Sequence, residues 1–417
     1  MNVTSIRLTH PSKQIGGTVQ LTGSKSESNR ALIIQALSKG LVQVENLSEA
    51  ADTVIMQAAL RRAQDADKSL VTTIDIGPAG TAMRFLTSYL NTIKGEFILT
   101  GTERMQQRPI GILVDALHAI GAKIGYEKQQ GYPPIRIQGR LTQQNERVSI
   151  KGNVSSQYIS SLLLIAASLE KGLTLDIEGE LTSRPYVTMT LNMLQEAGIT
   201  HTWKDNSIQI APQSYKPTTI YVEPDWSAAS YWYAIVALSD NGHIVLPGLK
   251  ESSLQGDIAI KDIMQHFGVE STFKNDGLHL TKTAQVSSET LFDFKECPDL
   301  AQTIVALTAA LKRDISITGV ETLKIKETDR LNALKVEIAK FGAELIADGE
   351  VYHIRTANIY TPENLDIDTY EDHRMAMAFA PLALVFPQLT IHEPMVVEKS
   401  YPDFWQHLSN QGFQIQE

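Results

Sequence analysis

Cysteine is almost absent from this sequence, which contains only Cys297. A disulfide framework and a zinc site built from several cysteines are therefore excluded. Positive charge is also scarce, because the formal net charge is -10 at pH 7 and the pI is near 5.5. Nucleic-acid and anionic-membrane partners need a basic face, so we expect neither. Any local cluster of cations should then serve a small ligand.

Long apolar runs are missing as well. No run approaches the roughly 18 residues that a membrane-spanning helix needs. The N-terminal stretch MNVTSIRLTH has no basic segment followed by an apolar one, as a secretory signal would. We therefore expect a cytoplasmic protein. With 417 residues, of which 43% are hydrophobic, the chain is long enough for two domains that each bury a core.

A recurring pattern organises the chain. Five segments read as an amphipathic helix closed by a glycine, which is the residue that suits the left-handed conformation after a helix. The closing glycines are Gly121, Gly198, Gly268, Gly342 and Gly412, at intervals of 77, 70, 74 and 70 residues. These intervals predict repeats of about 70 residues.

A second set of helices is apolar on nearly all sides and alternates with the first set. It comprises ALIIQALSKG, TAMRFLTSYL, YISSLLLIAASL, SAASYWYAIVAL, LAQTIVALTAAL and MAMAFAPLALVF. Such helices are buried. Short alternating stretches such as YPPIRIQG, SIQIAP and VYHIRT predict strands. Six repeats fill the chain; the first is the shortest, lacks the closing glycine, and has its second helix from about Asp52. Because neither end looks like a polar cap, we favour two α/β domains of three repeats with a cleft between them over an open solenoid.

Cations and small polar residues stand beside the predicted helix starts. Pro109, Pro185 and Pro402 mark three of these starts, with Arg108, Arg184 and Lys399 just upstream. Ser, Thr, Asp and Asn at such places are usually helix caps. A cation there opposes the helix dipole, so it predicts an anionic ligand. Two carboxylates are candidates for proton transfer: Asp299 beside an apolar helix, and Glu327 among cations.

Other anion-binding and metal motifs are absent. Ser24 separates Gly23 from Lys25, so the Walker A pattern fails, and neither GxGxxG after a strand nor HExxH occurs. His373 is more typical of a hydrogen-bonded histidine than of a metal ligand, and Cys297 of a small buried residue.

Nine ordered motifs resemble the EPSP synthase family, the 3-phosphoshikimate 1-carboxyvinyltransferases. They are GSKSESNRALI, AGTAMRFL, RPIG, SSQYISSLLL, SRPY, PDLAQTI, KETDRL, DHRMAMA and KSYPDFW, and they extend from about residue 20 to about residue 405. The resemblance implies transfer of the enolpyruvyl group of phosphoenolpyruvate to the 5-hydroxyl of shikimate 3-phosphate. It implies no metal and no organic cofactor. We expect a monomer.

The resemblance also implies roles for individual residues. Asp299 would be the general base, Glu327 the proton donor or relay, and Lys25 a catalytic residue that touches both substrates. The expected ligands of shikimate 3-phosphate are Lys25, Ser26, Arg30, Ser155, Ser156, Gln157, Ser183 and Lys326. The expected ligands of phosphoenolpyruvate are Gly80, Arg108, Gln157, Arg330, Arg374 and Lys399.

The fold implied by the family is two domains, each of three βαβαββ units with buried parallel helices, an inverse α/β barrel. We expect one domain from residues 1–19 and 227–417, an inserted domain from 20–226, crossovers near 20 and 226, and the active site in the cleft between them. Three positions depart from the family pattern: Pro78, Phe85 and Thr322. The first two leave the response to the herbicide glyphosate open.

Two alternatives stay open. A sister enolpyruvyl transferase acts on UDP-N-acetylglucosamine, but its family usually carries a reactive cysteine shortly before the RP segment, and MQQRPIG has none. A non-catalytic anion-binding repeat protein is the second alternative, and the presence of both Asp299 and Glu327 argues against it.

Overall fold

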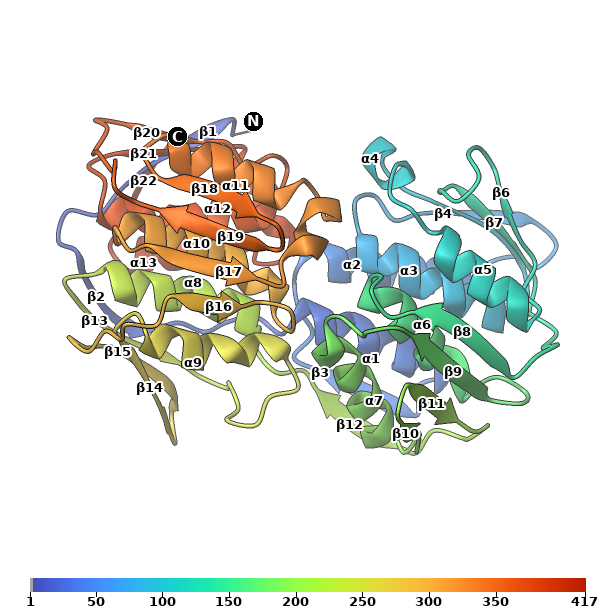
Figure 1. The fold of residues 1–417 in the computed structure, drawn as a ribbon. Coiled ribbons are helices and arrows are strands. Elements are labelled where there is room, and N and C mark those ends of the chain that lie inside the picture. The colour runs from blue at the N-terminus through green and yellow to red at the C-terminus, as the bar shows by residue number, and fades with distance from the viewer. Residues whose placement is uncertain (1–2) are drawn as a thin grey trace. The chain divides into compact units, whose positions relative to one another are not determined.

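The computed structural model describes residues 3–417 and divides into two compact units (Figure 1). One unit contains the residues up to Thr22 together with Glu223–Glu417, and we call it the 223–417 unit. The other contains Gly23–Val222, and we call it the 23–222 unit. Each unit consists of three repeats, and each repeat has one buried and one amphipathic helix, as the sequence predicted.

The 23–222 unit begins with a short repeat whose sheet has two strands. It consists of β12 (Thr218–Tyr221), α1 (Lys25–Leu37), β3 (Val42–Glu45) and α2 (Ala51–Gln64). The second repeat consists of β4 (Val71–Asp75), α3 (Gly80–Tyr89), η1 (Leu90–Thr92), β5 (Glu96–Thr100), α4 (Glu103–Gln106), α5 (Gly111–Ile120), β6 (Ile124–Tyr126) and β7 (Ile135–Gln138). The third consists of β8 (Arg147–Lys151), α6 (Ser156–Ala166), β9 (Leu173–Glu178), α7 (Arg184–Glu196), β10 (Thr202–Lys204) and β11 (Ser207–Ile210).

The 223–417 unit has a four-stranded sheet in every repeat. The first consists of β2 (Gln14–Thr18), α8 (Trp226–Leu238), β13 (Asn241–Leu246), η2 (Gly256–Ala259), α9 (Ile260–Gln265), β14 (Val269–Lys274) and β15 (Gly277–Lys282). The second consists of β16 (Leu291–Asp293), η3 (Pro298–Leu300), α10 (Ala301–Ala310), β17 (Ile315–Thr318), η4 (Glu321–Ile325), α11 (Arg330–Ala339), β18 (Glu344–Asp348) and β19 (Val351–Arg355). The third consists of β20 (Leu365–Ile367), α12 (His373–Phe379), η5 (Ala380–Leu384), β21 (Leu389–His392), η6 (Pro394–Lys399), α13 (Phe404–Asn410), β22 (Gln414–Gln416) and β1 (Ser5–Thr9).

The same pairing recurs in all six repeats. The first two strands of each repeat are parallel, as β4 and β5 or β16 and β17 are, and in four of the six repeats the buried helix connects these two strands along the chain. In the four-stranded sheets two antiparallel strands then extend the sheet, for example β7 and β6 beside β5. The N-terminal strands β1 and β2 complete sheets of the 223–417 unit, and β12 pairs with β3. The pattern is βαβαββ, except that the first repeat of the 23–222 unit stops after its second helix.

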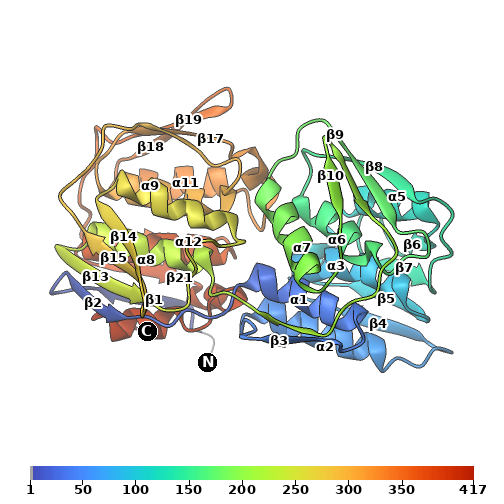
Figure 2. The same cartoon turned by 90° about the horizontal axis from the view of Figure 1, so that it is seen from below.

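The buried helices form the centre of each unit. Helices α1, α3 and α6 contact one another in the 23–222 unit, and α8, α10 and α12 do so in the 223–417 unit. Within each unit the strands lie outside these helices (Figures 1 and 2). One face of strands such as β5 and β8 is buried, as their alternating burial shows. Cys297 is buried in the core of the 223–417 unit, as the sequence predicted.

The helix ends follow the local signals with two exceptions. All five closing glycines have positive φ, from 76° at Gly268 to 109° at Gly121. Pro185 lies in the first turn of α7, but α5 and α13 begin two residues after Pro109 and Pro402, so these prolines precede the helices. Arg184 is the first residue of α7 rather than upstream of it, and its guanidinium stacks on the Trp203 ring at 4.2 Å.

Candidate functional site

Four helix starts of the 223–417 unit bring polar side chains together. Ser227 lies in the first turn of α8, Asp299 in the turn η3 that leads into α10, Arg330 at the start of α11, and Arg374 in the first turn of α12. Hydrogen bonds among these side chains show that the helix starts converge. Helix N-termini present unpaired N–H groups and the positive end of the dipole, so anions are stabilised there.

Arg330 is the centre of this cluster and is 1% exposed. Its Nη1 donates to Asp299 Oδ1 at 2.9 Å, its Nη2 to Glu327 Oε2 at 2.9 Å, and its Nε to Asp372 Oδ2 at 2.7 Å. Burial by itself lowers the pKa of Arg330, but Asp372, Glu327 and Asp299 raise the pKa above its ordinary value. The guanidinium is therefore charged and held in one orientation.

Asp299 accepts from two guanidinium groups at once. Arg374 Nη2 lies 2.9 Å from its Oδ2, and Lys326 Nζ lies 3.6 Å from its Oδ1. Burial raises the pKa of Asp299, but Arg374, Lys326 and Arg330 together outweigh burial and hold the pKa well below its ordinary value. In this state Asp299 is an ionised carboxylate and a weak base.

Glu327 lies between two cations. Its Oε2 accepts from Arg330, and its Oε1 lies 3.3 Å from Lys399 Nζ. Four cations (Lys326, Arg330, Arg374 and Lys399) thus meet three carboxylates (Asp299, Glu327 and Asp372), a difference of one positive charge. The sequence argument assigned these cations to ligand anions alone, whereas carboxylates of the chain already neutralise most of their charge.

Sequence reasoning missed several members of this cluster. Asp372 caps α12 by accepting from the Arg374 backbone N–H at 2.9 Å, and it is also a partner of Arg330. Ser227 Oγ donates to Asp257 Oδ2 and accepts from Arg374 Nη2 at 3.3 Å. Burial and the neighbouring Asp299 raise the pKa of Asp257 to about 7. The only signal for Asp372 was its place as the first residue of the motif DHRMAMA, and Asp257 lies in none of the nine motifs.

The 23–222 unit places the first predicted motif at the start of α1. Lys25 Nζ lies 3.3 Å from Asp52 Oδ2, which belongs to α2. Ser24, just before the helix, caps it by accepting from the Glu27 backbone N–H. Ser26 offers its backbone carbonyl to Arg30 Nη1 at 2.8 Å.

Arg30 is 2% exposed and ties three helices together. Its Nε donates to Thr190 Oγ1 at 2.7 Å, and its Nη2 donates to Ser160 Oγ at 3.2 Å and to the Tyr186 carbonyl at 3.3 Å. The guanidinium carbon lies 5.3 Å from the Phe85 ring centre, so this departure from the family pattern packs against a predicted ligand residue. Burial lowers the pKa of Arg30 to about 10, against the opposing influence of Tyr186 and Glu27, which leaves the side chain charged at neutral pH.

Gly80 and Arg108 lie in contact. A Cβ at Gly80 would come within 2.7 Å of Arg108 Nη1 and 3.0 Å of Arg84 Nη1. The absence of a side chain at the start of α3 therefore allows both guanidinium groups to approach the backbone. Gln157 Nε2, in the first turn of α6, donates to Thr81 Oγ1 at 3.2 Å, which links the starts of α6 and α3.

The three other predicted serines occupy helix starts as well. Ser155 caps α6 by accepting from the Gln157 backbone N–H at 3.4 Å, and Ser156 is the buried first residue of that helix. Ser183 precedes α7 with φ of 55°, a left-handed conformation that is uncommon for a residue other than glycine, and its side chain makes no capping bond. Capping therefore explains Ser155 but not Ser183.

The predicted residues fall into one cluster in one unit and several smaller groups in the other. Six of them form the cluster of the 223–417 unit: Asp299, Lys326, Glu327, Arg330, Arg374 and Lys399. In the 23–222 unit, Lys25 pairs with Asp52, Arg30 links α1 to α6 and α7, Gly80 contacts Arg108, and Gln157 contacts Thr81. Within residues 3–417, no group of three or more His, Cys, Asp or Glu side chains is arranged to hold a metal ion.

Comparison with known proteins decides the family. The family model for EPSP synthase (3-phosphoshikimate 1-carboxyvinyltransferase) matches residues 9–408. The chain belongs to the EPSP synthase family. A 3-phosphoshikimate 1-carboxyvinyltransferase from Bacteroides fragilis is 47% identical over 411 residues, which cover 96% of this chain and 97% of the relative. One from Pseudoalteromonas atlantica is 36% identical over 423 aligned positions, with 96% and 97% coverage.

Solved structures show the same fold. An EPSP synthase from Acinetobacter baumannii superposes with a TM-score of 0.77 at 20% identity and covers all of both chains. An enolpyruvyl transferase from Streptomyces tendae superposes with a TM-score of 0.74 at 16% identity, covering 99% of this chain and 98% of that one. The fold predicted from the sequence, two α/β domains of the EPSP synthase type, is therefore confirmed.

Proposed function

We propose that this chain transfers the enolpyruvyl group of phosphoenolpyruvate to the 5-hydroxyl of shikimate 3-phosphate and releases phosphate. The family model and the named relatives support this reaction. The observation that carries the proposal is the cluster around Arg330. In this cluster the two candidate proton-transfer carboxylates, Asp299 and Glu327, form ion pairs with four cations. Both substrates carry a phosphate and a carboxylate, the groups that bind such cations.

The cations of the 223–417 unit have distinct proposed roles. Arg330, Arg374 and Lys399 bind phosphoenolpyruvate, and Lys326 binds shikimate 3-phosphate. The side chains of Arg374 and Lys399 are 8% and 13% exposed, against 2% for Arg330, so both are more accessible to a ligand than Arg330 is. Arg330 is less available to a ligand, because three carboxylates already surround its guanidinium group.

The residues of the 23–222 unit bind the same two substrates in this proposal. Shikimate 3-phosphate is bound by Lys25, Ser26, Arg30, Ser155, Ser156, Gln157 and Ser183. Phosphoenolpyruvate is bound by Gly80, Arg108 and Gln157. Arg30 donates to groups of the chain through Nε, Nη1 and Nη2, so we assign it chiefly to holding α1, α6 and α7 in place. The location of the active site between two domains stays a prediction.

In the proposed reaction each of the two carboxylates transfers one proton. Asp299 accepts the proton of the 5-hydroxyl, whose oxygen bonds to the central carbon of phosphoenolpyruvate, while Glu327 donates or relays a proton to the methylene carbon. Loss of a methyl proton and of phosphate then restores the double bond. Asp299 is a weak base in the free protein because Arg374, Lys326 and Arg330 hold its pKa down. Substrate anions that neutralise these cations raise the basicity of Asp299, so binding itself activates the base.

A phosphate-release assay tests the proposal. We expect release only when shikimate 3-phosphate and phosphoenolpyruvate are both present, and transfer of the enolpyruvyl group to the 5-position in the product. Turnover with UDP-N-acetylglucosamine would indicate the sister enzyme instead. Binding of both ligands without turnover would indicate a non-catalytic anion-binding protein.

The proposed reaction does not determine the cellular location or the oligomeric state of the chain. Within residues 3–417, no helix is both long and apolar enough to cross a membrane. The cytoplasmic location and the monomeric state stay predictions, and sedimentation of the purified chain over a range of concentrations tests the second.

A further inference from the structure

The first repeat of the 23–222 unit lacks the two antiparallel strands that extend the sheet of every other repeat. Residues 65–70 connect α2 directly to β4, and the sheet consists of β12 and β3 alone. In other repeats the hairpin strands pack on the repeat's own helices: β15 contacts α8, β14 contacts α9, and β18 contacts α11. By the same arrangement, a hairpin after α2 would cover α1 and α2. Here that cover is missing.

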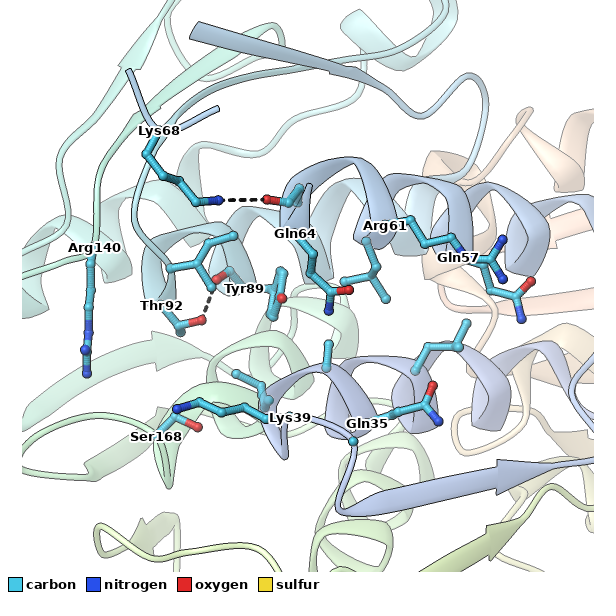
Figure 3. Close-up of a pocket in the computed structure, with 17 residues that line it drawn as sticks. Gln35, Lys39, Gln57, Arg61, Gln64, Lys68, Tyr89, Thr92, Arg140 and Ser168 are labelled. Carbon is cyan, nitrogen blue, oxygen red and sulfur yellow. Dashed lines mark hydrogen bonds between the residues drawn. The ribbon is translucent and has the colours of Figure 1, made fainter. Parts of the chain in front are cut away.

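A cavity of about 880 Å³ is lined by these two helices. Its walls include the C-terminal half of α1, the C-terminal half of α2, the turn η1 and the loop residue Arg140 (Figure 3). Buried Leu32, Leu60 and Tyr89 contribute an apolar floor. In Figure 3 the amide side chains of Gln57 and Gln64 extend into the space between α1 and α2. The volume is within the range of about 300–1,000 Å³ that is typical of small-molecule sites.

The charged groups of the cavity wall are all cations. Lys39, Arg61, Lys68 and Arg140 line it, and the lining contains no Asp or Glu. All four side chains are exposed, and across residues 3–417 none of them forms a salt bridge. Lys39 and Arg61 lie near helix C-termini, where a cation is favourable, and Lys68 Nζ donates to the Ala63 carbonyl at 3.4 Å.

Arg140 has no such local explanation. It follows β7 of the neighbouring repeat, yet its side chain lies on the same cavity as the three other cations (Figure 3). Four lining cations that form no salt bridge within residues 3–417 are unexpected in a chain with a net charge of -10.

We propose that this cavity binds a small organic anion that carries two or more phosphate or carboxylate groups on an apolar ring or chain. The cations recognise the anionic groups, and the floor of Leu32, Leu60 and Tyr89 packs against the apolar part. This site belongs entirely to the 23–222 unit and is separate from the substrate residues of the proposed reaction.

Calorimetric titration of the full chain with benzene tetracarboxylate at low ionic strength tests the proposal, with inorganic phosphate as the second probe. The cavity variant combines Arg61→Gln with Arg140→Gln. The matched control combines Lys123→Gln with Lys151→Gln, which removes the same charge from exposed positions of the same unit outside the cavity lining. A third protein, Lys25→Ala, reports binding at the proposed substrate site.

We expect the cavity variant to bind benzene tetracarboxylate about two- to thirtyfold more weakly than the wild type, since it loses two exposed charge contacts. The matched control and Lys25→Ala should keep the wild-type affinity. Hydrogen exchange should show that the probe protects residues 32–40 and 57–68, which include cavity-lining parts of α1 and α2.

Four results would overturn the proposal: no binding to the wild type, equal weakening in the cavity variant and the matched control, loss of binding in Lys25→Ala alone, or binding of inorganic phosphate as tight as that of benzene tetracarboxylate. The last result would show that the apolar floor has no part in binding.

Discussion

Asp372→Asn is the change that most directly tests the cluster around Arg330. The Asp372 side chain is fully buried, and it accepts from Arg330 Nε at 2.7 Å and from Arg330 Nη2 at 3.4 Å. Its Oδ1 also accepts from the Arg374 backbone N–H. Asparagine preserves the shape and one acceptor oxygen but removes the charge. It also turns an amide N–H₂ toward groups that are themselves donors.

The magnitude follows from the burial of both partners. Removing one member of a buried ion pair costs about 3–5 kcal/mol, because the other charge is left uncompensated. Arg330 retains Asp299 and Glu327, and asparagine can still cap α12, so part of this cost is avoided. We therefore expect the free energy of unfolding to fall by about 2–3 kcal/mol. An exposed pair would contribute at most about 1 kcal/mol.

Urea unfolding followed by tryptophan fluorescence is the assay. Trp226, Trp232 and Trp405 all belong to the 223–417 unit, so the signal reports mainly on the unit that contains Asp372. Asp329→Asn is the matched control. Asp329 is exposed and caps α11 by accepting from the Asn332 backbone N–H at 3.1 Å, a role that asparagine fulfils equally well.

The control should stay within about 0.5 kcal/mol of the wild type. If Asp372→Asn is no less stable than Asp329→Asn, Asp372 is not a charge partner of Arg330 in the folded protein. The description of the cluster as three carboxylates on one guanidinium would then be wrong.

Three further changes test the proton-transfer residue, the titration of Asp257 and the Gly80 contact. Asp299→Asn should lower kcat by about 10²- to 10⁴-fold, because a general base is lost; steady-state kinetics with an unchanged kcat would remove Asp299 from the mechanism. Burial and Asp299 raise the pKa of Asp257 to about 7, so the stability that its protonated form contributes is complete below the unfolded pKa and is lost as pH rises through about 7. Asp257→Asn should therefore gain stability relative to the wild type as the pH rises from about 4 to about 7 in urea unfolding, and a difference that does not vary with pH contradicts this assignment. Gly80→Ala should raise the KM for phosphoenolpyruvate with a smaller effect on kcat, since the new Cβ would meet Arg108 Nη1 at 2.7 Å and displace a flexible side chain rather than the backbone; an unchanged KM would show that Arg108 does not bind this substrate.

The local elements of this protein were predictable from short stretches of sequence. Gly121, Gly198 and the three later closing glycines have the positive φ that a helix end requires, and the second helix of the first repeat begins at Ala51, one residue before the predicted start. Helix periodicity and capping depend on neighbours within a few residues, so the sequence carries these signals directly. The family motifs added the residue types of the proposed site.

The partners of those residues came only from tertiary packing. Arg330 meets Asp299 and Asp372, which are 31 and 42 residues away along the chain, and Arg30 meets Thr190 at a separation of 160. Strands β1 and β2 complete sheets whose other strands lie more than 200 residues later. No local periodicity encodes such pairings, because they follow from which helix starts and strand edges come together when the apolar faces are buried.

Composition and periodicity thus determined the six repeats and the buried and amphipathic helices. The tertiary structure decided which carboxylate neutralises which cation, and it revealed that the missing hairpin of the first repeat leaves a cationic cavity over α1 and α2. The physical reason is that charge and hydrogen-bond energies depend on distance and burial, and both are set by packing rather than by order along the chain.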